Sequence, residues 1–362
     1  MVVVPETVLL KEADSISVQQ AALAHCGGKM RNRIAILDVW GGDKDRQDPA
    51  GDCIDQFRSA LGINYLDFAT AYYPWVNTTI VQESELSYEN IANPDLLQQL
   101  LRAELGLGDT ADDNSSPKAT QQIEMINNIT SNWDDRADED VLADKMLLNK
   151  SLRASSPMFG NLIVEMREQL NLLPPAAAMA GVYTMVDNTR GVWKAPANVS
   201  LNAVVSPTVN ITHDEQEDLN VTTQGKSINA IRSFIGEGTL VWGARTLDGN
   251  SLDWRYVNVR RTMIMLEESI RLATKAYVFE PNTANTWVTI KSMIRNFLTG
   301  IWKRGGLAGA VPDDAFSVHV GLGETMTSED ILEGILRVTV LVAISRPAEF
   351  IEITFQQQMQ KS

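Results

Sequence analysis

The stretch SINAIRSFIGEGTLVWGARTL, residues 227–247, predicts two β-strands joined by a tight turn. Its β-branched and aromatic runs, 228–234 and 239–244, are separated by Gly236-Glu237-Gly238, a composition typical of turns. Downstream, apolar residues recur every three or four positions from Tyr256 to Pro281, which predicts one long amphipathic helix. The residues of this apolar stripe are Val259, Met263, Leu266, Ile270, Ala273 and Tyr277. Two strands followed by a long helix indicate an α/β core.

The composition is that of a folded protein with an acidic surface. The chain has 362 residues, of which 44% are hydrophobic, and a formal net charge of −15. This acidity argues against nucleic acid and anionic membranes as partners, because binding phosphate groups requires a basic surface. The sequence contains two cysteines, Cys26 and Cys53, and neither a signal peptide nor a membrane-spanning segment is recognisable. We therefore expect synthesis in a reducing cytoplasm and no membrane insertion.

The N-terminal part predicts a β-α-β unit. Residues 33–39 form an apolar run typical of a buried strand, 52–61 have a helical pattern, and the aromatic run 68–76 predicts a second strand. Pro74 would place that second strand near a sheet edge. A unit of this kind implies a parallel strand pair. No G-x-G-x-x-G follows the first strand, so a dinucleotide site is not favoured.

Residues 84–173 differ from the flanking sequence, because helical patterns there are separated by polar linkers. In the linker 106–118, Asp109, Asp112 and Asp113 lack the ligand spacing of a calcium loop, and we interpret them as a solvated turn. The sequence thus predicts three segments: 1–83 as the first half of the core, 84–173 as an all-helical insertion, and 174–362 as the C-terminal core. The predicted fold is α/β, with a mixed sheet flanked by helices.

The C-terminal part predicts a helix over 285–304 and three strands over 315–320, 333–344 and 350–356. In the last strand, one face carries Ile351, Ile353 and Phe355, and the other carries Glu352, Thr354 and Gln356. Such a terminal strand has backbone groups to offer to a neighbouring sheet. The residues alone fit an internal edge strand equally well.

Catalytic motifs are not recognisable in the sequence. His25, His213 and His319 are far apart along the chain and separate from the cysteines, so neither a zinc site nor a Cys-His pair is indicated. There is no phosphate-binding loop and no G-x-S-x-G. We therefore expect no catalytic, metal or cofactor site, and a soluble α/β enzyme or nucleotide-binding domain is the alternative hypothesis.

Several motifs occur in one order along the chain: 191–198 (GVWKAPAN), 241–247 (VWGARTL), 254–261 (WRYVNVRR), 279–282 (FEPN) and 347–350 (PAEF). In this order they resemble the C-terminal core of contractile tail sheath proteins. Two further stretches, 33–38 and 71–75, resemble the preceding sheath segment. The resemblance implies that the motif residues form a scaffold: Trp193, Lys194, Pro196, Asn198, Trp242, Arg245, Trp254, Arg260, Glu280, Pro281 and Asn282. We expect Trp242 and Trp254 in the core, and Arg245 and Arg260 paired with carboxylates.

Sheaths of this kind surround the inner tube of phage tails, R-type pyocins and extracellular contractile injection systems, and contract to drive the tube through a target envelope. The resemblance implies a structural subunit, without cofactor, in a helical array of identical chains around a tube protein, with baseplate and cap proteins as further partners. It implies assembly in the bacterial cytoplasm and later residence in a virion tail or a released particle. The helical insertion is expected to face outward.

The resemblance also implies two contact sites. The strand Phe350, Ile351, Glu352, Ile353, Thr354, Phe355 and Gln356 is expected to add to the sheet of a neighbouring subunit. A helix over 324–333 is expected to face the tube through Glu324, Ser328, Glu329, Asp330 and Glu333. Family members carry an extended N-terminal arm before the strand at residue 33, and we expect this chain to lack it.

Overall fold

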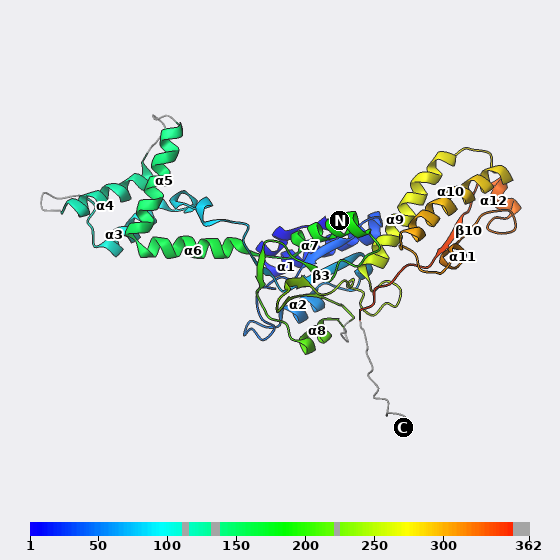
Figure 1. The fold of residues 1–362 in the computed structure, drawn as a ribbon, viewed down its shortest axis with the longest axis horizontal. Helices are drawn as coiled ribbons and strands as arrows, with labels where there is room; N and C mark the ends of the chain where they lie inside the picture. Colours follow the sequence, from blue (N-terminus) through cyan, green and yellow to red (C-terminus); the bar gives the residue numbers. More distant parts are fainter. Residues whose placement is uncertain (111–115, 132–137, 221–224, 350–362) are drawn as a thin grey trace, which may run out of the picture. The chain divides into compact units, whose positions relative to one another are not determined.

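The computed structural model describes residues 1–110, 116–131, 138–220 and 225–349 (Figure 1). The chain divides into two compact units. The central unit comprises Met1–Trp75, Pro174–Asn202 and the chain from Ser206 onward, and the insertion unit comprises Val76–Leu173 and Ala203–Val205. Among the described residues, no helix combines the length and apolar character needed to cross a membrane.

A six-stranded mixed sheet forms the centre of the central unit. Its strand order is β1 (Val2–Val3), β2 (Ala35–Asp38), β3 (Ala69–Tyr73), β8 (Asn229–Phe234), β9 (Gly238–Val241) and β6 (Val199–Ser200). Strands β1, β2, β3 and β8 pair in parallel, whereas β9 is antiparallel to both of its neighbours. The predicted β-α-β unit is confirmed, with α2 (Cys53–Ala60) between β2 and β3. The prediction that Pro74 marks an edge strand is wrong, because β3 is interior and ends at Tyr73.

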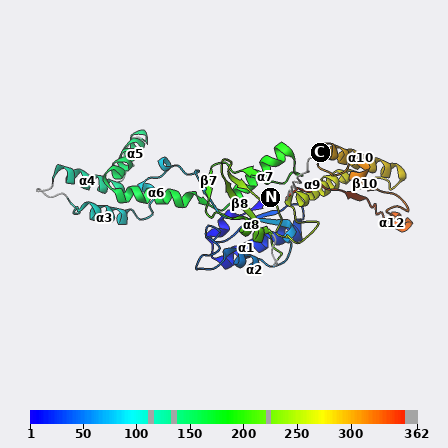
Figure 2. The ribbon, with the colours of Figure 1, turned by 60° about the horizontal axis from the view of Figure 1, so that its bottom comes forward.

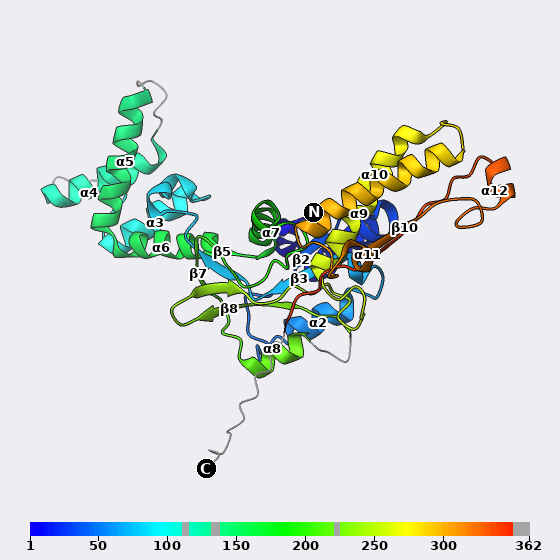
Figure 3. The same ribbon diagram turned by 45° about the vertical axis from the view of Figure 1, so that its right-hand side comes forward.

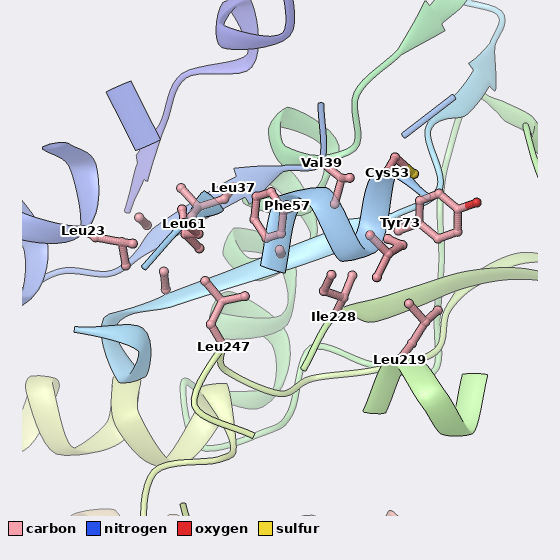
Figure 4. Packing of buried hydrophobic residues seen from close by; sticks show 14 of the residues in the cluster. Leu23, Leu37, Val39, Cys53, Phe57, Leu61, Tyr73, Leu219, Ile228 and Leu247 are labelled. Atoms are coloured by element: carbon pink, nitrogen blue, oxygen red, sulfur yellow. The ribbon is translucent and has the colours of Figure 1, made fainter. Parts of the chain in front are cut away.

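Helices cover both faces of this sheet (Figure 2). One face packs against α1 (Glu12–Leu23), α2 and α8 (His213–Asn220), with Leu23, Phe57 and Leu219 among the buried side chains (Figure 4). The other face packs against α7 (Ala176–Arg190), where the hydroxyls of Tyr72 and Tyr183 are 2.6 Å apart. Because helices cover both faces, every residue of β2 and β3 is buried, and apolar or aromatic residues predominate at both sets of alternating positions.

A helical hairpin and a small sheet complete the central unit. They consist of α9 (Val257–Thr274), the 3-10 turn Lys275–Tyr277, α10 (Ala284–Lys303), α11 (Pro312–Ala315), β10 (Phe316–His319), α12 (Ser328–Leu332) and β11 (Thr339–Val342). Strand β10 lies along α10 (Figure 3) and pairs antiparallel with β11. The predicted helix over 256–281 is therefore too long, since α9 ends at Thr274. The predicted strand over 333–344 is likewise reduced to β11, and the strand over 350–356 lies outside the described residues.

The insertion unit contains α3 (Pro94–Leu105), α4 (Pro117–Asn127), α5 (Asp138–Ser155) and α6 (Pro157–Asn171) around a core that includes Leu101, Ile126, Leu152 and Phe159. Asn93, Ser116 and Ser156 each cap a helix that begins with proline, where the missing N–H is not needed. A three-stranded sheet in the order β5 (Leu172–Leu173), β4 (Val76–Thr78) and β7 (Val204–Pro207) follows α6, which contacts β4 and β5. The prediction of an all-helical segment is thus wrong at β5.

Candidate functional site

An apolar groove of about 900 Å³ lies between α9, the start of α10 and β11. Val338, Val340 and Val342 line it from the strand side, and Leu266 and Ile270 line it from α9. Thr339 and Leu341 on the opposite face of β11 are exposed. The period-two alternation of β11 therefore directs one row of valines at the groove.

Strand β11 also has an open edge. In the described part of the chain, β10 and β11 form a sheet of two strands, so no strand pairs with the other edge of β11. Such an edge presents backbone N–H and C=O groups that an extended peptide can bind. One extended segment could therefore form backbone hydrogen bonds with the open edge and pack every second side chain against the row of valines.

The loop before α10 exposes apolar side chains at the same groove. Val278 and Phe279 line the groove while remaining 59% and 103% exposed. Phe279 has a φ of +71°, a backbone conformation that non-glycine residues rarely adopt. Of the neighbouring scaffold residues, Glu280 and Pro281 are exposed, whereas Asn282 donates to the Ile335 carbonyl at 3.1 Å and accepts from Trp287 Nε1 at 2.6 Å. Asn282 thereby connects the start of α10 to the segment that leads into β11.

The structure corrects the predicted acidic helix over 324–333. The helix, α12, contains only Ser328–Leu332, and Glu324 lies outside it. Glu324 contacts His319 Nδ1 at 2.7 Å, and this hydrogen bond holds the pKa of Glu324 below its usual value. Asp330 accepts from the Thr327 backbone N–H and pairs with Arg337 at 3.0 Å. Ser328, Glu329 and Glu333 are exposed.

The prediction that Arg245 and Arg260 pair with carboxylates is confirmed, and both partners belong to the same chain. Arg245 is 2% exposed and its Nη2 lies 2.6 Å from Glu349 Oε2. Arg260 pairs with Asp67. The Arg260 guanidinium also lies over the ring of Trp254 at 3.6 Å and over that of Phe68 at 4.4 Å. Stacking on aromatic faces partly replaces the water that a buried guanidinium loses.

The prediction that Trp242 and Trp254 pack in the core is wrong, because both are half-buried. Trp242 packs against the ring of Phe234, with the centroids 4.6 Å apart. Trp254 uses a ring face to cover Arg260. Aromatic spacing alone does not reveal whether a ring contacts core residues or covers an arginine.

The motif 191–198 links α7 to the sheet. Trp193 packs so closely against Gly191, whose φ is +94°, and Gly306 that a Cβ at either glycine would lie within 3 Å of its ring. The Trp193 carbonyl accepts from Asn258 Nδ2 at 2.9 Å. Lys194 donates to the Ala195 carbonyl at 3.0 Å, and its burial lowers the pKa of the amine. Pro196 is buried, and the exposed Asn198 takes a positive φ as it enters β6.

Sequence reasoning missed one buried acid, Asp38 at the end of β2. Its side chain is 2% exposed, and Oδ1 accepts from the Ala176 backbone N–H at 2.8 Å, at the start of α7. Burial raises the pKa of Asp38 to about 7, although this hydrogen bond acts in the opposite direction. The acidic residue at the end of an apolar run is the signal that could have identified it. No set of three or more His, Cys, Asp or Glu residues in the described ranges is arranged to hold a metal ion.

Comparison with known proteins identifies related sequences. Residues 250–358 match the family described as phage tail sheath C-terminal domain. The tail sheath protein of Enterobacteria phage T4 is 24% identical over 135 residues, covering 37% of this chain and 20% of that protein. The tail sheath protein of Vibrio phage KVP40 is 28% identical over 138 residues, again covering 37% and 20%.

A solved structure extends the similarity to nearly the whole chain. The PVC sheath complex of an extracellular contractile injection system, in its contracted state, is 30% identical, covers 90% of this chain and 64% of that chain, and has a TM-score of 0.57. The helical sheath of the anti-feeding prophage, also contracted, is 44% identical and covers 52% of this chain and 51% of that one, with a TM-score of 0.48. The chain thus matches about a fifth of the length of its phage relatives.

Proposed function

This chain is a relative of the contractile tail sheath proteins, and on that premise we propose that it is a structural subunit of a contractile sheath. Identical copies polymerise helically around an inner tube protein, together with baseplate and cap proteins, and contraction drives the tube through a target envelope. Assembly takes place in the bacterial cytoplasm, and the product is a virion tail or a released injection particle. The similarities favour this role over the alternative of an α/β enzyme.

The observation that carries the proposal is the open edge of β11 beside the apolar groove. In the assembled sheath, residues 350–356 of a neighbouring copy occupy this edge. Their alternating pattern places Ile351, Ile353 and Phe355 on one face. This apolar face is suited to pack against the valines Val338, Val340 and Val342 that line the groove. Backbone pairing supplies affinity, and the apolar face supplies register.

The remaining contacts follow the same proposal. The exposed Ser328, Glu329 and Glu333 face the tube protein, whose contact surface is then expected to be basic. The insertion unit faces outward and does not take part in the contacts that hold the sheath together. The scaffold residue Asn282 holds the segment before β11, through the Ile335 carbonyl, and Asn258 on α9 holds the segment after it, through the Ser345 carbonyl.

Negative-stain electron microscopy of the purified full chain tests the main proposal. Hollow cylinders are the expected result, and a monodisperse monomer at high concentration, in both low and high salt, would contradict it. The strand contact is tested by ending the chain after Glu349, which retains the Arg245–Glu349 pair. We expect a folded subunit by circular dichroism that forms no cylinders, whereas intact cylinders from this chain would refute strand exchange.

The groove is tested by a matched pair of substitutions in one strand. Val340→Asp places a charge at the groove, and Leu341→Asp places the same charge on the opposite face, where Leu341 is 59% exposed. We expect Val340→Asp to abolish cylinders and Leu341→Asp to retain them, with thermal melting of each subunit measured alongside. Loss of assembly in both variants, with both folded, would contradict the groove as the acceptor.

A further inference from the structure

Glu349, the last described residue, is held by a buried arginine. Its carboxylate accepts from Arg245 Nη2 at 2.6 Å, from Arg245 Nε at 2.9 Å and from the Tyr256 hydroxyl at 3.0 Å. The Arg245 side chain is 3% exposed. Because a guanidinium contacts a carboxylate at two points in a fixed plane, the pair sets the orientation of Glu349 as well as its position. We call this arrangement of Arg245, Glu349 and Tyr256 the clamp.

The arginine of the clamp is itself fixed by the central sheet. Arg245 Nη1 donates to the Asn220 carbonyl at 2.8 Å, at the end of α8. Its backbone N–H donates to Asn229 Oδ1 at 2.7 Å, and its carbonyl accepts from Thr70 Oγ1 at 2.9 Å, so β8 and β3 hold its main chain. Within the described residues, Glu349 forms the one salt bridge of Arg245. A buried guanidinium without its carboxylate is strongly unfavourable, which favours the docked position of Glu349.

The chain leading to the clamp is also held at Ser345. The Ser345 carbonyl accepts from Asn258 Nδ2 at 3.2 Å, and its hydroxyl donates to the Gly305 carbonyl at 3.2 Å. Between Ser345 and the clamp, Arg346 and Ala348 are exposed, and Arg346 forms a solvent-exposed ion pair with Asp253 at 3.5 Å, a contact that holds the chain only weakly. The clamp therefore fastens the chain again, after a short stretch in which Pro347 is half-buried and its neighbours Arg346 and Ala348 are exposed.

We propose that Glu349 is a positioning residue, and that the clamp fixes the point from which residues 350–362 leave the subunit. The inference rests on the proposed function, in which this segment pairs with a neighbouring copy. The effective concentration of a tethered strand at its acceptor depends on the length of chain between anchor and contact. With the clamp closed, the anchor is Glu349. With the clamp open, it retreats to Ser345 and residues 346–349 join the tether.

The clamp is tested first in the unassembled subunit with a spin label on Ala348→Cys, an exposed site in a chain whose own cysteines are buried. Glu349→Gln keeps the shape of the side chain but brings an amide NH₂ group to the guanidinium. We expect a restricted label in the parent and a mobile label in the Glu349→Gln variant. Glu268→Gln, which removes the same charge from an exposed pair with Arg271, is the control and leaves the label restricted. Equal mobility in all three chains would overturn the clamp.

The positioning role is tested by inserting Gly-Ser at two places. Between Arg346 and Pro347 the insertion precedes the clamp, and we expect cylinders with the parent's resistance to urea. Between Glu349 and Phe350 it lengthens the tether, and we expect cylinders that dissociate at lower urea. In the Glu349→Gln background the two insertions should lower the urea resistance of the cylinders by the same amount. An ion pair that only stabilised the subunit would not make the effect of an insertion depend on its position relative to Glu349.

The outcomes separate the two proposals. A parent chain that forms no cylinders contradicts the proposed function, and the spin-label result still decides whether the clamp exists. A parent chain that forms cylinders, with equal effects of both insertions while Glu349 is present, overturns the positioning role alone. Circular dichroism of each variant shows whether the subunit is folded. If a Gly-Ser insertion prevents folding, a single glycine is inserted at the same place instead.

Discussion

We expect the stability of the subunit to fall with rising pH because of Asp38, and the substitution Asp38→Asn to remove this dependence. Asp38 is buried at the end of β2, and its pKa is raised from 3.8 to about 7. A raised pKa in the folded state means that folding favours the protonated acid. The favourable contribution of Asp38 to the free energy of unfolding is therefore fully present below pH 3.8 and is lost as the pH rises through 7.

The magnitude follows from the two pKa values. A shift of about three units corresponds to roughly 4 kcal/mol between the low-pH and high-pH limits. Between pH 5 and pH 8 the part that is lost amounts to roughly 2 to 3 kcal/mol. Asparagine at position 38 can still accept a hydrogen bond from the Ala176 N–H through its Oδ1, and it carries no charge. The free energy of unfolding of Asp38→Asn, relative to that of the parent, is therefore expected to rise by this amount between pH 5 and pH 8.

Urea unfolding followed by circular dichroism at pH 5 and pH 8 measures the difference. The chain ending after Glu349 serves as the parent for this experiment, because assembly would alter its apparent stability. Asp14→Asn, which removes the same charge from an exposed position on α1, is the control. If the free energies of the parent and Asp38→Asn change in parallel with pH, the buried carboxyl is not the cause and the reasoning fails.

Three further changes are expected to have distinct effects. Arg260→Lys should destabilise the subunit by about 2 kcal/mol, because lysine loses the planar stacking between Trp254 and Phe68, whereas Arg271→Lys in an exposed pair should have a much smaller effect. Urea unfolding of both variants checks this, and equal losses would contradict it. Trp242→Ala should cost about 2 kcal/mol, less than a fully buried tryptophan, since Trp242 is half-buried; an unchanged melting temperature would refute the packing on Phe234. Replacing residues 109–114 by Gly-Ser-Gly-Ser should leave cylinders intact under the electron microscope, and their loss would contradict an outward insertion that is not needed for assembly.

Local patterns in the sequence were sufficient for the elements whose packing is local. The run before Asp38, the aromatic run before Pro74 and the apolar stripe of α9 each predicted the observed type of element. These patterns work because the spacing of apolar residues must match the period of a strand or a helix wherever a face is buried. The family motifs carried the functional hypothesis, since short-range periodicity contains no information about assembly.

Pairing over long sequence separation was decided by the tertiary structure. The sequence predicted carboxylate partners for Arg245 and Arg260, but Glu349 and Asp67 follow only from the fold, because each lies on an element far away along the chain. The strand β7 pairs with β4, which lies more than a hundred residues earlier in the chain, and no local pattern encodes this pairing.

Burial and element length near the candidate site were likewise decided in three dimensions. Trp254 covers Arg260 instead of entering the core, and α12 stops at Leu332 where the sequence suggested a longer acidic helix. Whether an aromatic or acidic residue is buried depends on which surface the fold places beside it. The open edge of β11 is of the same kind: alternation in the sequence predicts a strand, but only the arrangement of α9, α10 and β10 leaves one edge of that strand without a partner among the described residues.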